Sequence, residues 1–490
     1  MKVLFVVIGK SLGNNSLLIK NADFIVTMDN RRRIIKNGNI YIEKPKIISV
    51  GKNIEVSYSA DRVIDARGKI AIPGLINTHH HLSQTLTRVI PVAQNVSLFP
   101  WLLSLYDIWR EITVKHIYIG ALVGLGELLL TGCTTTSDHY VQHVPSVQHS
   151  IDVEIKAADE IGIRFHPCRG IINRGRSKGG LPPDDLAEDM DKALKDSERI
   201  IRKYHDMKKF SMCRVALGPC SPFSVTRDAL EETIKLARKY EGVLSHTHIA
   251  DSKQDFDYCM KNYGVSPLKL MESTGWLGRD VWFAHAILLD KTEIGILAKT
   301  GTGVAHCPRS NMRLASDNKM DPAPVPEMLR HGVRVGLGVD GSASNDASNM
   351  LDELRTCLLV HRPAYGVSSM TATQVLEIAT LGGAKILHRN EIGSIEVGKA
   401  ADIVLIDLKQ LGYAGAMHDP VAALLFCGDS CRVHTNIVNG EIVVEDGKLV
   451  NVDEQEICEK ANELARELVD KAGKRRGKNY LKQKWIRAFK

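Results

Sequence analysis

Short apolar stretches of β-type sequence recur along the middle of the chain, and each ends at or near a histidine or an aspartate. Five of them are AIPGLINTHHHL (71–82), VLSHTHIAD (243–251), VWFAHAI (281–287), GTGVAHCP (301–308) and RVGLGVDG (334–341). A segment of helix length separates most of these stretches from the next. Strands that alternate with helical segments predict βαβ units and a parallel sheet.

The number of such strands matches a closed barrel. Strand ends are predicted near His79, Asp138, Cys168, Pro219, His248, His285, His306 and Asp340. Eight parallel strands with intervening helices form a (β/α)8 barrel, whose ligands lie at the carboxyl ends of the strands. We therefore predict an α/β protein with a (β/α)8 barrel over residues 73–390.

The two ends of the chain have a different sequence pattern, with short predicted strands that alternate with turn signals. Examples are LLIKNADFIVTMD and NGNIYIE before residue 72, and GSIEVGKAADIVLID and TNIVNGEIVVEDGKLV after residue 392. Neither end has enough strands to bury a face alone. We expect 1–72 and 391–451 to form one small composite β-sandwich domain. Residues 452–490 predict a C-terminal helix and a basic tail.

Length and charge change this picture little. The 490 residues exceed one barrel of about 250, which agrees with an added domain. The net charge of +7 depends on the last twenty residues, which hold nine Lys or Arg and no acid, so the rest carries 7 − 9 = −2. We therefore expect no nucleic-acid partner, and we interpret the tail as a solvated helix end.

Cysteines and apolar runs indicate the compartment. Ten cysteines occur without a CxxC spacing, and the closest pair is Cys427 and Cys431. This usage is typical of a reducing cytoplasm, where we expect the protein. The stretch VLFVVIG after Lys2 is interpreted as an edge strand rather than a signal peptide. No apolar run approaches the about 20 residues of a membrane helix, so no membrane partner is expected.

The candidate chemistry is a metal centre. His79 and His81 are two residues apart, so on an extended strand both side chains point to the same side. An isolated HxH pair is a weak signal, but His248, His285 and Asp340 follow at later strand ends. A divalent ion needs several neutral imidazoles or carboxylates that converge, and the top of a barrel brings distant strand ends together.

Other histidines and one glycine motif have simpler interpretations. His80 should point away from the ion, and His246 is equally compatible with a role behind the ligands and with the core. His306 is interpreted as part of the site wall because HCPRSN surrounds it. GLGVDG (336–341) fits the dinucleotide pattern GxGxxG, but the carboxylate of Asp340 would repel a pyrophosphate, so no nucleotide site is predicted.

The motifs PGLINTHHHLSQTLTR, LSHTHIAD, WFAHAILLD, GVAHCPRSNMRL and LGVDGSASND resemble the cytosine deaminase-like branch of the amidohydrolase superfamily. PCRGIINRGRSKGGLPPD and LGPCSPFSV are similar to its 8-oxoguanine deaminase and hydroxydechloroatrazine ethylaminohydrolase group. The resemblance implies one divalent ion, zinc or alternatively iron, with a water completing its shell. The implied ligands are His79, His81, His248 and Asp340.

The resemblance also implies roles in catalysis. His285 would bond to the metal-bound water or to the substrate, and Asp340 would accept the proton of the water. Some superfamily members bridge two metals with a lysine on the fourth strand, but MCRVALGPCSP lacks one, which implies a mononuclear site. A glutamate three residues after the third histidine carries protons in the family, and this chain has Asp251 there.

Together these features predict a hydrolytic deaminase of an aminated N-heterocycle, first of all 8-oxoguanine. Triazine ethylaminohydrolase, isocytosine, cytosine, guanine and adenosine-type deaminase activities remain open. Cyclic amide hydrolysis is disfavoured by the missing lysine, and a barrel without chemistry by the intact ligand set. Substrate contacts are expected from Gln84, Trp109, Arg174 and Ser344, with Trp109 equally compatible with a core position; Cys220 and Phe223 are expected in the pocket wall. The partners are then a small heterocycle, water and further copies of the chain in a homo-oligomer.

Overall fold

The computed structural model describes residues 15–54, 60–145, 147–315, 322–429 and 432–482, and the VLFVVIG segment lies outside them. Within these residues, eight parallel strands close into a barrel, which confirms the predicted fold. In barrel order the strands are β6 (Leu75–Asn77), β8 (Cys133–Tyr140), β9 (Arg164–Ile171), β10 (Ala216–Pro219), β11 (Leu244–Ile249), β12 (Val281–His285), β13 (Gly303–His306) and β14 (Arg334–Leu337).

The first and last barrel strands continue beyond the barrel and pair a second time. β7 (His80–His81) follows β6, β15 (Asp340–Gly341) follows β14, and the two short strands are parallel, with Asp340 opposite His80. The backbone N–H of Asp340 donates to the carbonyl of His79 over 3.0 Å. This pairing brings the first histidine motif (71–82) and the last aspartate motif (334–341) together above the barrel.

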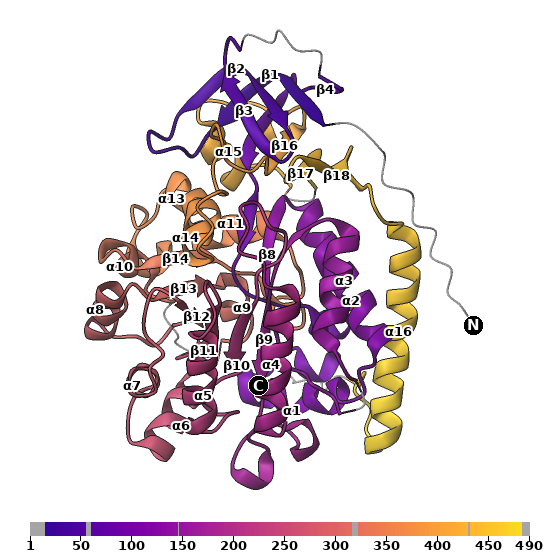
Figure 1. The fold of residues 1–490 in the computed structure, drawn as a ribbon, viewed down its shortest axis with the longest axis vertical. Coiled ribbons are helices and arrows are strands. Elements are labelled where there is room, and N and C mark those ends of the chain that lie inside the picture. The colour runs from indigo at the N-terminus through magenta and orange to yellow at the C-terminus, as the bar shows by residue number, and fades with distance from the viewer. Residues whose placement is uncertain (1–14, 55–59, 146, 316–321, 430–431, 483–490) are drawn as a thin grey trace, which may run out of the picture.

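Helices surround the barrel, as Figure 1 shows. They are α1 (Leu98–Trp109), α2 (Val114–Leu130), α3 (Ser150–Ile161), α4 (Met190–Tyr204), α5 (Arg227–Ala237), α6 (Lys253–Tyr263), α7 (Pro267–Ser273), α8 (Lys291–Thr300), α9 (Pro308–Arg313), α10 (Val325–Arg330), α11 (Met350–Val360), α12 (Arg362–Tyr365), α13 (Ala372–Glu377) and α14 (Gly383–Ile386). Local sequence fixes several starts. At α8 the Asp290 side chain accepts from Glu293 N over 2.8 Å, and Glu293 accepts from Asp290 N over 3.2 Å, a reciprocal cap.

The two chain ends build one sheet, at the top of Figure 1. Its strands within the described residues are β1 (Ser16–Val26), β2 (Ile34–Glu43), β3 (Lys46–Gly51), β4 (Arg62–Asp65), β5 (Lys69–Pro73), β16 (Ile403–Asp407), β17 (Thr435–Val438), β18 (Glu441–Glu445) and β19 (Lys448–Leu449). β5 and β16 pair antiparallel and join the N-terminal and C-terminal strands. Buried Ile19, Ile40 and Ile403 form part of its own apolar core, so the domain is composite as predicted. The short helix α15 (Pro420–Phe426) lies between β16 and β17 in sequence.

A buried ion pair joins this sheet to the barrel. The guanidinium of Arg164 on β9 contacts the carboxylate of Asp402, just before β16, and donates to Thr135 Oγ1 over 3.1 Å and to Asn439 Oδ1 over 3.1 Å. Both charged side chains are at most 3% exposed. Buried charges remain only where they are paired and hydrogen-bonded, so these contacts hold the sheet against the barrel.

The C-terminal segment packs along the barrel helices. Helix α16 (Glu454–Arg476) runs along α2 and also contacts α1 (Figure 1). Beyond it, Tyr480 is only 1% exposed, and its hydroxyl donates to Asp107 Oδ2 over 3.3 Å. The described cations of this segment are exposed, as interpreted from the sequence, but Arg475 and Arg476 also pair with Glu111 and Asp107 and Tyr480 packs against α1, which the sequence did not indicate.

The cysteines that the structure describes are free thiols, and most of them are buried. Among the described helices, none combines the length and the apolar character needed to cross a bilayer.

Candidate metal centre

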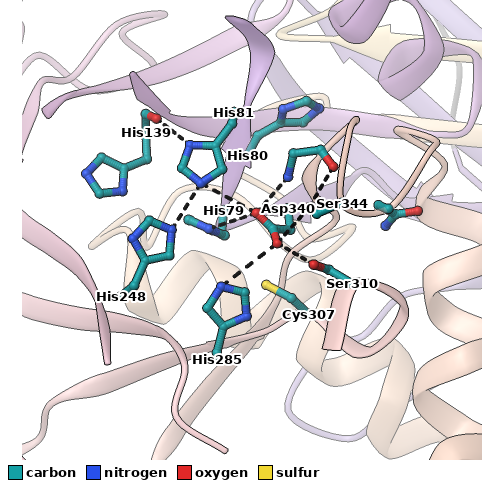
Figure 2. Close-up of polar contacts among 12 residues, drawn as sticks. His79, His80, His81, His139, His248, His285, Cys307, Ser310, Asp340 and Ser344 are labelled. Atoms are coloured by element: carbon teal, nitrogen blue, oxygen red, sulfur yellow. Dashed lines mark hydrogen bonds and ion pairs between the residues drawn. The ribbon is translucent and has the colours of Figure 1, made fainter. Parts of the chain in front are cut away.

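Three imidazoles are anchored through their Nδ1 atoms and point their Nε2 atoms to a common region (Figure 2). His81 Nδ1 donates to the His139 carbonyl over 2.6 Å, and His248 Nδ1 donates to the Cys220 carbonyl over 2.5 Å. His79 Nδ1 lies 2.7 Å from the Nε2 of a fourth imidazole, His246. A hydrogen bond at one ring nitrogen fixes the tautomer and leaves the other as a metal ligand.

The role of His246 follows from its own partner. Its Nδ1 donates to the carbonyl of Trp282 over 3.0 Å, and the ring stacks on the Trp282 indole. His246 Nε2 therefore accepts from His79 Nδ1, which leaves His79 Nε2 without a proton. Of the two sequence interpretations, the structure favours the position behind the ligands.

The distances among the facing atoms suit a single ion. His81 Nε2 and His248 Nε2 are 3.0 Å apart, and Asp340 Oδ1 lies 3.2 Å from His79 Nε2 and 3.5 Å from His81 Nε2. Four ligands at about 2.1 Å in tetrahedral geometry are roughly 3.4 Å apart. Within the described residues, buried His79 Nε2 has no hydrogen-bond partner. Three nitrogens and one oxygen form a donor set that fits zinc.

Asp340 is held by contacts from helix α9 and from the segment that follows β15. Its Oδ2 accepts from Ser310 Oγ over 2.5 Å and from Ser344 Oγ over 3.0 Å, and its Oδ1 accepts from Gly341 N over 2.6 Å. Asp340 has a backbone φ of 64° and His285 a φ of 67°. Left-handed backbone at residues other than glycine is strained and concentrates at functional sites.

The protonation states also favour a cation. Burial lowers the pKa of His79 and His81, and lowers the pKa of His248 to about 3, so these imidazoles are neutral at pH 7. Burial opposes the charge of Asp340, but His79, His285 and His81 hold the pKa of its carboxyl well below the usual range. Neutral imidazoles and an ionised carboxylate are the forms that bind a divalent metal.

The centre opens into a pocket with apolar walls. Of the predicted substrate contacts, Gln84 on the 3₁₀ helix η1 (Leu82–Thr87), Trp109 and Ser344 line it. Trp109 is also fully buried and donates from Nε1 to Thr87 Oγ1 over 3.0 Å. It therefore belongs both to the pocket wall and to the core. Cys220 and Phe223 line the pocket as expected.

Arg174 lies apart from this pocket. Its Nη1 donates to Tyr263 Oη over 2.9 Å, its Nε donates to the Lys178 carbonyl over 2.9 Å, and its guanidinium covers the ring of Tyr258. These contacts place it outside the residues that line the pocket in this structure. Its role in substrate binding stays a prediction.

Asp251 and His285 face the pocket as a pair. Asp251 Oδ1 lies 3.8 Å from His285 Nδ1, which donates to Asn311 Oδ1 over 2.8 Å. Burial raises the pKa of Asp251, and the nearby Asp340 raises it further although His285 opposes the shift. Burial opposes charge on His285, but the carboxylates of Asp251 and Asp340 raise its pKa above the ordinary value.

His80 and His306 point away from the metal centre. His80 is fully buried and faces away, with Nε2 2.9 Å from Ser348 Oγ. His306 does not form the site wall; its Nε2 lies 3.2 Å from His361 Nε2. The HCPRSN segment contributes instead through Ser310 and Asn311, which contact Asp340 and His285.

Sequence reasoning also missed His139 and Asp255. His139 stacks behind His81 and His248 at ring distances of 5.6 and 5.0 Å. Asp255 on α6 lines the pocket, and burial together with Asp251 raises its pKa to about 7. The sequence signal for His139 was its place next to Asp138 at a strand end, and that for Asp255 was its spacing one helical turn after Asp251.

A barrel that presents neutral imidazoles and a carboxylate to one point, below a pocket with an acid and a further histidine, defines a metal-dependent hydrolase. The chain belongs to the amidohydrolase family, whose model matches residues 70–443. It is accordingly a hydrolase of carbon–nitrogen bonds in cyclic amidines that uses a single divalent metal ion.

Known proteins of this family cover nearly the whole chain. The 8-oxoguanine deaminase of Pseudomonas aeruginosa is 39% identical over 417 residues, 85% of this chain and 91% of that protein. Hydroxydechloroatrazine ethylaminohydrolase of Pseudomonas sp. strain ADP is 33% identical over 461 residues, 91% of this chain and 94% of that protein. The zinc complex of atrazine chlorohydrolase from Arthrobacter aurescens TC1 superposes with a TM-score of 0.87 at 34% identity, covering 92% of this chain and 100% of that one.

Proposed function

We propose that this enzyme is a zinc-dependent aminohydrolase that removes an exocyclic amine from an oxo-purine, with 8-oxoguanine as the first substrate. The observation that carries the proposal is the pocket directly above the three imidazoles and the carboxylate, which holds Asp251 and His285 between apolar walls. The similarity to 8-oxoguanine deaminase supports the choice of heterocycle.

The chemistry requires an attacking water, a proton for a ring nitrogen and a proton for the departing amine. A bound divalent ion supplies the first by lowering the pKa of water to about 7. Asp340, already at the centre, accepts the proton of this water. Asp251 would give its proton to the ring nitrogen, and His285 Nε2 would polarise the oxygen that attacks. The second proton of the water, on the hydroxyl of the adduct, would pass through these carboxyls to the amine, which leaves as ammonia; transfer of the first proton from Asp340 to Asp251 would restore the starting state.

The pocket suits a flat substrate with polar edges. Aromatic and aliphatic side chains from α1, among them Trp101 and Tyr106, line the pocket together with Phe223. Buried Gln84 presents an Oε1 without a hydrogen-bond partner among the described residues, so it can accept from a ring N–H. We assign edge recognition to Gln84 and Ser344.

Amine release from a panel of substrates tests the proposal, with ammonia measured for oxo-purines, pyrimidines and adenosines and ethylamine measured for ethylamino-hydroxytriazines. The highest kcat/KM is expected for 8-oxoguanine, and Asp340→Ala serves as the matched control because it removes a ligand. Faster turnover of a hydroxytriazine would favour the second candidate, an ethylaminohydrolase, which the similarity to the atrazine-degrading proteins supports. Release from no heterocyclic amine would contradict both candidates.

The wider setting of the activity is also a proposal. We place the enzyme in the cytoplasm, where purine bases are salvaged and where its free thiols stay reduced. We expect a homo-oligomer. Light scattering of the purified protein measures its mass, and a monomer at micromolar concentration would refute that expectation.

A further inference from the structure

The wall of the substrate pocket that α1 provides is not part of the barrel. Leu98, Trp101, Leu102, Tyr106 and Trp109 line the pocket from this helix. On the inner side, Trp101 Nε1 donates to the Ala343 carbonyl over 3.2 Å. Because no strand hydrogen bonds fix α1 within the described residues, its position depends on side-chain contacts.

The C-terminal segment supplies contacts on the other side of the same helix. Asp107, between Tyr106 and Trp109 in sequence, is 5% exposed, and its Oδ2 lies 3.2 Å from Arg476 Nε and accepts from Tyr480 Oη over 3.3 Å. The backbone carbonyl of Tyr480 accepts from Val92 N over 3.4 Å. Both side-chain contacts converge on one carboxylate in the last turn of α1.

A second cluster follows immediately after α1. Glu111 is paired with Arg475 and lies 3.2 Å, Oε2 to Nζ, from Lys471. The two cations draw down the pKa of the Glu111 carboxyl although burial opposes this. The cations at the end of α16 therefore pair with acids at and just after the end of α1.

The structure assigns Tyr480 and Arg476 as positioning residues of the substrate pocket: they hold Asp107, and through it the α1 wall, against the barrel. This inference rests on the proposed function, because the pocket is taken as the substrate site. The metal ligands stand on strand ends and do not contact this segment. Loss of the strap, Arg476 and Tyr480, should therefore weaken substrate binding and leave the metal and the chemical step intact.

The full-length variants Tyr480→Ala and Arg476→Gln test the inference, with Leu481→Ala as the control because Leu481 is 59% exposed. Loss of a hydrogen bond to the Asp107 carboxylate should loosen the α1 wall, so KM should rise about 3- to 10-fold with kcat within twofold. Zinc content should match the wild type. The KM of Tyr480→Phe, which keeps the ring, should lie between the KM values of the wild type and Tyr480→Ala.

A readout without substrate separates this inference from the proposed function. Trp101 and Trp109 lie on α1, so acrylamide should quench tryptophan fluorescence more in Tyr480→Ala than in the wild type or in Leu481→Ala. Unchanged quenching and unchanged KM, with only a lower Tm, would overturn the positioning role. A wild type that releases no ammonia, together with increased quenching in Tyr480→Ala, would refute the proposed substrate and leave the role of the strap standing.

Discussion

Replacement of Asp251 by asparagine tests the proton-carrying step most directly. The change keeps the shape and hydrogen-bonding capacity of the side chain but removes the group that titrates. General acid-base catalysis contributes about 10²–10⁴-fold, or about 2.7–5.4 kcal/mol of barrier. We expect kcat for 8-oxoguanine to fall by that factor while KM changes little.

The structure gives an independent magnitude for the same change. Asp251 Oδ1 lies 3.8 Å from His285 Nδ1, and unit charges at that distance interact by about 4 kcal/mol at an effective dielectric constant of about 20. Asp251 is the main group that raises the pKa of His285, so the asparagine variant should also lower that pKa. The Coulomb figure concerns the charge of His285 in this variant, and the expected loss of turnover, about 10²–10⁴-fold, depends on the acid-base role of Asp251.

The pH dependence of kcat/KM gives a second test of the role of Asp251. Burial raises the pKa of Asp251, so its carboxylate forms at a higher pH than an ordinary aspartate would require. Asp251 donates its proton in the acid form, so the basic limb of kcat/KM should lie above the usual carboxyl range in the wild type and disappear in Asp251→Asn. Steady-state ammonia release at several pH values measures both, with zinc content as the control.

Two outcomes would refute this reasoning. Turnover of Asp251→Asn within a few fold of the wild type would show that His285 or water carries the proton. Asp251→Glu lengthens the side chain by one methylene in a pocket built around the shorter acid. If that variant turned over a different heterocycle faster, the aspartate would be a substrate-selecting feature instead.

Three further predictions concern the metal centre and the buried acids. Protein reconstituted with zinc should contain about one equivalent by elemental analysis, because the ligand set closes around one ion; two tightly held equivalents would contradict a mononuclear site. His246→Phe keeps a ring against Trp282 but removes the acceptor of His79, and loss of such a contact typically weakens metal affinity about 10–100-fold, which chelator competition measures; unchanged affinity would refute the orienting role. Burial raises the pKa of Asp138 to about 7 and that of Glu154 well above its usual value, so the folded state keeps protons that the unfolded state releases, and stability should fall as pH rises from about 4 to 7. Urea unfolding at several pH values should show a smaller fall in the free energy of unfolding for Glu154→Gln than for the wild type. The same pH dependence in both proteins would contradict the prediction.

The sequence alone determined the barrel and the candidate ligands, and the reason is local. Apolar β stretches that end in His79, His81, His248 and Asp340 place these side chains at the carboxyl ends of strands. Once the strands form a closed parallel sheet, those ends lie on one face of the barrel whatever the loops do. The composite domain followed in the same way, since neither chain end could bury a sheet face alone.

Only the tertiary structure decided how the centre is oriented. The nitrogen that each imidazole offers depends on partners far away in sequence: His246 for His79, the His139 carbonyl for His81 and the Cys220 carbonyl for His248. No spacing in the sequence encodes such contacts, because they form between segments that meet only when the barrel closes.

The same reason explains one wrong prediction and one set of contacts that the sequence did not indicate. The HCPRSN segment indicated His306, but the path of the chain after β13 turns Ser310 and Asn311 toward the centre and His306 toward His361. The cations from Lys471 onward were interpreted as solvated, and the described ones are exposed, but their ion pairs could not be predicted because a run of charge has no partner in the linear sequence. The folded chain brings Asp107 and Glu111 to them, and long-range pairing of this kind is set by the packing of α16 on α1.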